Sequence, residues 1–151
     1  MSKKYIYIAG PLFTESDLNF NEQLSSFLRE KLDAVKWEVF VPQEFNINKE
    51  QIAADARLTN EKTIAEHDLD CIRKSSVIIA NLDNLDPGTF TELGYFFKKL
   101  DAEPTTLIFG IYTDWRKQLN KFVYGMFLIH QNAFLAANIA ELKETILKYV
   151  K

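Results

Sequence analysis

Residues 77–81, Val-Ile-Ile-Ala-Asn, are the strongest constraint on the fold of this chain, because the segment is continuously apolar from Val77 to Ala80. A strand with one face in water alternates apolar and polar residues. A strand of a parallel sheet is instead covered on both faces and is apolar throughout. The segment therefore predicts a buried strand of a parallel sheet, with helices on both faces of that sheet.

Strand-like and helix-like segments alternate along the rest of the chain. Further strands are predicted at residues 5–9, 37–41, 105–111 and 132–135, and helices at 15–33, 62–74, 89–100, 120–128 and 138–149. Residues 43–60 predict a loop with a partial helix, and residues 113–116 a turn. This order predicts an α/β fold, a doubly wound, mostly parallel five-stranded sheet of the Rossmann or flavodoxin type. No linker or repeat interrupts it, so residues 1–151 are expected to form a single domain.

Composition excludes several classes of function. Lys and Arg number 18 against 21 Asp and Glu, without a dense basic cluster, so nucleic acid is not an expected partner. No segment approaches the ~20 apolar residues of a membrane span, and no secretory signal is apparent, so we expect a cytoplasmic protein without membrane contact. Cys71 is interpreted as a small buried hydrophobe, and with only His67 and His130 a histidine-based metal site is not expected.

Carboxylates concentrate in the loop that follows the buried strand and begins the next helix, within residues 83–95. Ligands of α/β proteins bind at the carboxyl ends of the strands. Glu92 is expected about one turn into the helix, directed back toward the loop, where Asp86 can share the same cleft. Gly88 leaves room for a ligand to approach the backbone. Residues 86–89 equally fit an ordinary turn and helix cap, so spacing leaves both interpretations open.

A second acidic group, Glu66-His67-Asp68, lies late in the preceding predicted helix. Taken alone, Asp68 also fits a solvated helix position, and Tyr7 in the first strand also fits the core. Together, Glu92, two supporting acids and a tyrosine hydroxyl would suit reaction at an electrophilic sugar carbon. The sequence contains no phosphate-loop, nucleophile-elbow or zinc-helix motif, so carboxylates, tyrosine and amides are expected to carry the chemistry.

Three parts of the chain resemble, in the same order, the nucleoside 2-deoxyribosyltransferases: the run from Tyr5 to Phe13 (Tyr-Ile-Tyr-Ile-Ala-Gly-Pro-Leu-Phe), Asp68 before a buried strand, and Asp86-x-Gly88-Thr89-x-x-Glu92-Leu93-Gly94-Tyr95. The last of these is the specific part. The resemblance implies that Glu92 attacks the anomeric carbon of a 2′-deoxynucleoside, expels the base and holds the sugar as a covalent ester until another base takes it. It assigns Asp68 and Asp86 to proton transfer with the base, and Tyr7 to orienting the nucleophile.

The resemblance also implies substrate contacts and an assembly. Gly10, Gly88 and Phe13 would contact the substrate, Phe13 by stacking on the base, although simple packing explains an aromatic there equally well. Asn120 would contact the sugar's 5′-hydroxyl in a neighbouring subunit, which implies a homo-oligomer, a dimer or a hexamer, with shared active sites. The aromatic residues that follow it fit a subunit contact or a core: Phe122, Tyr124 and Phe127. The substrates would be 2′-deoxynucleosides and free nucleobases, with no metal or other cofactor.

Two alternatives to the transferase stay open. A 2′-deoxynucleoside 5′-monophosphate N-glycosidase has a similar fold and the same glutamate, but it uses water as acceptor and needs cationic or hydroxyl-rich phosphate contacts. Where such relatives carry arginine or serines, this chain has residues 11–14 (Pro-Leu-Phe-Thr), Pro87 and Asn120. A binding module without catalysis would not need Glu92 at the anomeric carbon. The sequence therefore favours the transferase, with the base preference and the extent of hydrolysis open.

Overall fold

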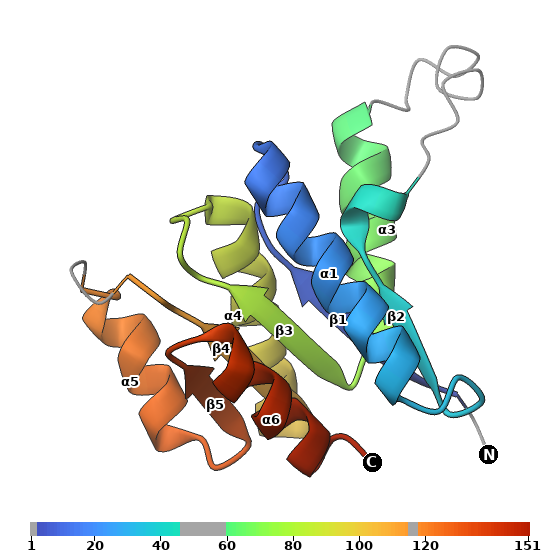
Figure 1. Cartoon of the computed structure of the whole chain (residues 1–151). Coiled ribbons are helices and arrows are strands. Elements are labelled where there is room, and N and C mark those ends of the chain that lie inside the picture. The colour runs from blue at the N-terminus through green and yellow to red at the C-terminus, as the bar shows by residue number, and fades with distance from the viewer. Residues whose placement is uncertain (1–2, 46–59, 115–117) are drawn as a thin grey trace.

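The computed structural model describes residues 3–45, 60–114 and 118–151, and Figure 1 shows their arrangement. Five parallel strands form one sheet in the order β2-β1-β3-β4-β5: β1 (Lys4–Ala9), β2 (Trp37–Phe40), β3 (Val77–Asn81), β4 (Leu107–Ile111) and β5 (Ala133–Ala136). The helices are α1 (Glu15–Lys31), the short 3-10 turn η1 (Pro42–Glu44), α3 (Asn60–Lys74), α4 (Pro87–Ala102), α5 (Lys121–Ile129) and α6 (Ile139–Tyr149). The predicted α/β fold is confirmed, and the strand order is that of the flavodoxin type.

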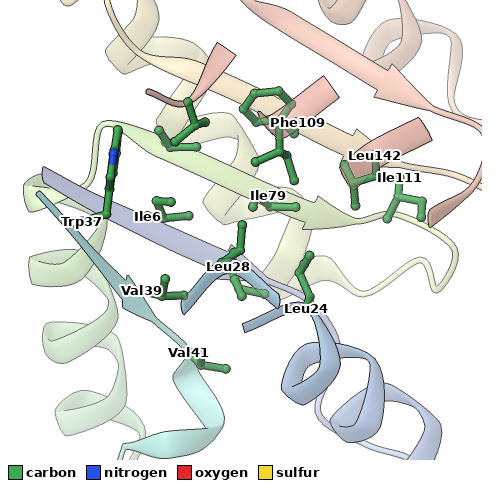
Figure 2. Packing of buried hydrophobic residues seen from close by; sticks show 14 of the residues in the cluster. Ile6, Leu24, Leu28, Trp37, Val39, Val41, Ile79, Phe109, Ile111 and Leu142 are labelled. Carbon is green, nitrogen blue, oxygen red and sulfur yellow. The ribbon is translucent and has the colours of Figure 1, made fainter. Parts of the chain in front are cut away.

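Alternate residues of the strands pack on opposite faces of the sheet. Ile6 and Ile79 belong to a core shared with α1 and α6, and Figure 2 shows Leu28 and Leu142 in that core. The other face packs against α3, α4 and α5, and Tyr7 of β1 belongs to that second core. Helices therefore cover both faces, as predicted, and Tyr7 points to the side of α3 and α4.

The order in which strands are added to the sheet reverses between β1 and β3. The chain runs from β1 outward to β2, then crosses back so that β3 pairs with the other side of β1, with Ile8 opposite Ile79. All residues of β3 are buried, which confirms its prediction as a buried strand of a parallel sheet. The carboxyl ends of β1 and β3 form the switch point, where folds of this type bind ligands.

Several boundaries differ from the prediction because caps and turns fix them. Helix α4 begins at Pro87 rather than residue 89, since Asp86 supplies its N-cap and proline suits the first helical position. Strand β4 begins at Leu107, because the amide of Thr106 is bonded to the carbonyl of Glu103 in the turn after α4. Residues 46–59 of the predicted loop and 115–116 of the predicted turn lie outside the described residues. Among the described helices, none combines the length and the apolar character that crossing a membrane requires.

Candidate active site

Tyr7 and Glu92 meet at the switch point. The hydroxyl of Tyr7 in β1 donates a hydrogen bond of 2.6 Å to Oε1 of Glu92 in α4, across 85 positions of the sequence. Tyr7 is 1% exposed, and burial and the charge of Glu92 both raise its pKa far above the usual value. The phenol therefore keeps its proton and serves as a donor that holds one carboxylate oxygen, while Oε2 of Glu92 is left for another partner.

The environment of Glu92 shifts its pKa to about 7. Burial is the largest cause, because it disfavours the charged carboxylate, and the negative charges of Asp68 and Asp86 act in the same direction. The hydrogen bond from Tyr7 opposes them. The structure thus brings together the four residues that the sequence proposes for catalysis, and a carboxyl with such a pKa is a candidate for chemistry near neutral pH.

Asp86 caps the N-terminus of α4 and also lies near enough to Glu92 for its charge to act on that carboxyl. Its Oδ2 accepts hydrogen bonds of 2.8 Å from both the backbone amide and the hydroxyl of Thr89, as an N-cap does. The predicted cap is therefore present. Because the cap occupies the amide of Thr89, that amide is not free for a ligand, and Oδ1 of Asp86 is the oxygen that the cap does not use.

Asp68 is partly buried in α3, whereas its neighbour Glu66 faces solvent. The Asp68 side chain is 18% exposed, and its Oδ1 lies 3.1 Å from Nδ1 of His67. Glu66 pairs with Lys62 at 3.7 Å and is 62% exposed. Of the acidic pair predicted in this helix, only Asp68 therefore belongs to the site.

Gly10 and Gly88 each lie so close to a neighbouring side chain that a larger residue would crowd it. A side chain at Gly10 would lie 2.9 Å from Oδ1 of Asn21, a buried residue whose amide donates to the side chain of Gln43. A side chain at Gly88 would lie 3.1 Å from Oδ2 of Asp86. Both glycines allow close packing at the carboxyl edge of the sheet. Their predicted contact with substrate stays a prediction.

Phe13 and Asn120 lie at the surface. The ring of Phe13 is 75% exposed in the loop between β1 and α1, where a base could stack on it. Asn120 is the N-cap of α5, and its Oδ1 accepts from the amides of Phe122 and Val123. No contact joins either residue to Glu92 within the described chain, so their roles stay predictions.

Two features of the site had no predicted role. Asp83 accepts hydrogen bonds from the amide and hydroxyl of Thr113, which joins the loops after β3 and β4. A pocket of about 450 Å³ opens beside Tyr7 and extends along β2, with Phe45 and His67 in its wall. Neither the Asp83–Thr113 contact nor the pocket can be predicted from local sequence, because each is formed by segments that only the strand order of the sheet brings together. In the part of the chain that the structure describes, no cluster of three or more His, Cys, Asp or Glu side chains is placed to hold a metal ion.

A family model described as nucleoside 2-deoxyribosyltransferase matches residues 6–141. An uncharacterised protein of Ureaplasma parvum serovar 3 is 36% identical over 146 residues, which covers 89% of this chain and 90% of that protein. The matched range of the family model includes every candidate residue described above.

Solved structures share the fold. A conserved protein of Enterococcus faecalis has a TM-score of 0.72 at 23% identity and covers 98% of this chain and 97% of its own. The CMP N-glycosidase of Clostridium botulinum has a TM-score of 0.64 at 18% identity, with 97% and 100% covered. A 2-deoxyribosyltransferase of Bacillus psychrosaccharolyticus has a TM-score of 0.57 at 21% identity, with 81% of each chain covered.

Proposed function

The chain belongs to the nucleoside 2-deoxyribosyltransferase family, and from this premise we propose that it transfers a 2-deoxyribosyl group between nucleobases with Glu92 as the nucleophile. The observation that carries the proposal is the 2.6 Å hydrogen bond from Tyr7 to Glu92 at the switch point. It holds a partly buried carboxylate in one orientation, which is what a nucleophile requires. Burial raises the pKa of Glu92 to about 7, and perturbations of this kind cluster at functional sites.

In the first half of the reaction, Oε2 of Glu92 attacks C1′ of a 2′-deoxynucleoside. A C1′–O bond forms, the C1′–N bond breaks, and its electron pair leaves with the base. Asp68 or Asp86 supplies the proton that the departing base takes up. In the second half, the nitrogen of another base attacks C1′, the ester bond breaks, and the aspartate recovers its proton from the incoming base.

The electrostatics of the site couple Glu92 to the two aspartates. The charges of Asp68 and Asp86 raise the pKa of Glu92, so protonation of either aspartate removes a repulsion that opposes ionised Glu92. The state with one protonated aspartate and an ionised Glu92 is the state that the first step needs. A sugar without a 2′-hydroxyl forms an oxocarbenium-like centre more readily, so these side chains suffice without a cofactor.

The proposal also includes a role for Asn120 in the active site of a neighbouring subunit. Its Oδ1 is engaged by the first turn of α5, so its amide Nδ2 would donate to the 5′-hydroxyl of the sugar. Phe122 at 75% and Ile129 at 71% exposure give α5 an apolar surface, and a groove of about 310 Å³ separates α5 from α4. Apolar surface on the helix that follows Asn120 supports a homo-oligomer in which this helix contacts a second copy.

Hydrolysis of a nucleoside 5′-monophosphate is the second candidate, favoured by the fold shared with a CMP N-glycosidase. It would use the same Glu92 with water as the acceptor. The loop after β1 carries Pro11, Leu12 and Phe13, which offer no donor side chain to a phosphate, and Thr14, whose Oγ1 is engaged in capping α1. We therefore place the transferase first.

One assay distinguishes the two. Protein is incubated with thymidine or deoxyinosine, with and without free adenine, and in parallel with the 5′-monophosphates, and the products are separated by chromatography. Formation of deoxyadenosine that depends on Glu92 supports the transferase. Cleavage of the monophosphates alone, unaffected by adenine, would contradict it.

A further inference from the structure

His67 lies at the centre of a group of contacts next to the proposed site. Its Nδ1 is 3.1 Å from Oδ1 of Asp68, and its Nε2 is 3.6 Å from Sγ of Cys71, one turn further along α3. Its ring stacks on Phe45, which follows η1, with the ring centroids 3.7 Å apart and the planes 10° from parallel. Three neighbours on two segments of the chain thus hold this imidazole in one place.

The neighbours also decide which nitrogen carries the proton. A carboxylate oxygen only accepts hydrogen bonds, so Nδ1 carries a hydrogen and donates it to Asp68. Burial raises the pKa of the Cys71 thiol to about 11, so the thiol keeps its proton and can donate it to Nε2. With these two contacts, both nitrogens of the imidazole have a partner.

Cys71, His67 and Asp68 have the order of a nucleophilic triad, but the thiol is not a candidate nucleophile. Cys71 is 4% exposed, and a thiol that stays protonated at neutral pH does not attack. The remaining role for His67 is to donate a hydrogen bond from Nδ1 to Asp68. Its partner Asp68 is the acid proposed to serve the base.

We propose that His67 is a positioning residue that binds Oδ1 of Asp68 and so presents Oδ2 to the leaving base. This inference rests on the proposed function. Among the described residues, His67 is the hydrogen-bond donor that contacts Asp68, which lies in the middle of a helix, and this contact fixes the rotamer of the acid. Phe45 stacks on His67, and both residues line the pocket beside Tyr7. The segment after β2 therefore helps to orient Asp68, because it positions the imidazole that binds the acid.

Two substitutions of His67 separate the donor from the ring. His67→Phe keeps a ring to stack on Phe45 but removes both nitrogens. His67→Asn loses the ring, while its side-chain amide can place an N–H close to the position of Nδ1. Glu66→Gln, on the solvent side of the same helix, is the matched control. Folding of each variant is checked by its urea midpoint.

The readout is base exchange with a natural deoxynucleoside. His67→Phe is expected to lower kcat roughly 10- to 100-fold, part of the ~100- to 10,000-fold that a positioned acid contributes, with KM changed less than about threefold. His67→Asn is expected to recover most of that loss. Equal kcat for His67→Phe and the wild type, or equal losses in both variants, would overturn the inference.

A second substrate tests the role of the proton itself. The 4-nitrophenolate of 4-nitrophenyl 2-deoxy-β-ribofuranoside leaves as a stable anion and does not need a proton. If His67 acts through Asp68, His67→Phe leaves the release of 4-nitrophenolate within about threefold of the wild type while exchange of the natural base falls. Equal slowing of both substrates would mean that His67 only maintains the fold, and the inference would be wrong.

Failure of this inference and failure of the proposed function give different results. If the wild type exchanges no base with any deoxynucleoside, the proposed function fails. If the wild type is active and Asp68→Asn is impaired but His67→Phe is not, only the role of His67 fails.

Discussion

Replacing Glu92 with glutamine is expected to abolish base exchange and, at the same time, to stabilise the fold at alkaline pH. Glutamine keeps the shape of glutamate, and its carbonyl oxygen can still accept the hydrogen bond from Tyr7. It removes the carboxyl whose pKa rises from 4.5 to about 7 on folding. The two effects have one cause, since the charge that the reaction needs is the charge that burial penalises.

The sign of the stability change follows from the direction of the shift. Between pH 4.5 and about 7 the folded protein holds a proton on Glu92 that the unfolded chain has released. The free energy of unfolding therefore falls as pH rises through this window, and the loss is complete above it. At about 1.4 kcal/mol per pKa unit, a shift of this size corresponds to roughly 3–4 kcal/mol. Below pH 4.5 both states are protonated, and the contribution of Glu92 to the pH dependence vanishes.

Urea unfolding followed by circular dichroism at about pH 4 and about pH 8.5 measures the effect. Glu92→Gln should match the wild type within about 1 kcal/mol at the lower pH and exceed it by roughly 3–4 kcal/mol at the higher pH. Glu144→Gln, at an exposed position of α6, is the matched control and should show no such difference. A stability difference between Glu92→Gln and the wild type that does not change with pH would refute the reasoning.

Three further predictions concern the nucleophile, the core and the assembly. Tyr7→Phe removes the hydrogen bond that lowers the pKa of Glu92, so the acidic limb of the kcat/KM profile should move up by about one to two pH units; an unchanged limb would contradict this. Gly110→Ala would place a methyl group 2.7 Å from a ring of α5 and should lower the free energy of unfolding by about 1–3 kcal/mol, whereas Gly125→Ala enters open space and should not lower it. Mixed oligomers of inactive Glu92→Ala and inactive Asn120→Ala subunits should recover exchange activity, and their failure to do so would argue against a shared site.

The fold was predictable because its strongest signals are local. The apolar segment at residues 77–81 and the alternation of strands with amphipathic helices suffice to indicate a parallel sheet, and the structure confirms both. The errors lie at boundaries set by contacts that periodicity does not report. Strand β4 begins at Leu107 because the residues before it belong to the turn that ends α4.

The site was predictable only in part. The sequence predicts that Glu92 and Asp86 share a crevice and leaves open whether Asp86 is a cap; the structure shows that the cap exists and lies beside Glu92. The contacts of Asp83 with Thr113 and of His67 with Phe45 could not be predicted, since each pairs residues from separate segments. Such pairs depend on the strand order, which a single sequence does not specify.

The most direct test of the proposed mechanism is mass spectrometry of the intact protein and its peptides after incubation with a 2′-deoxynucleoside and no acceptor base, followed by rapid acid quenching. The mechanism predicts that wild-type protein gains the mass of one deoxyribosyl group, on the peptide that contains Glu92, and that added adenine removes it. Glu92→Gln should gain no mass. Turnover by the wild type without any adduct, or an adduct on another residue, would contradict the role of Glu92 as the nucleophile.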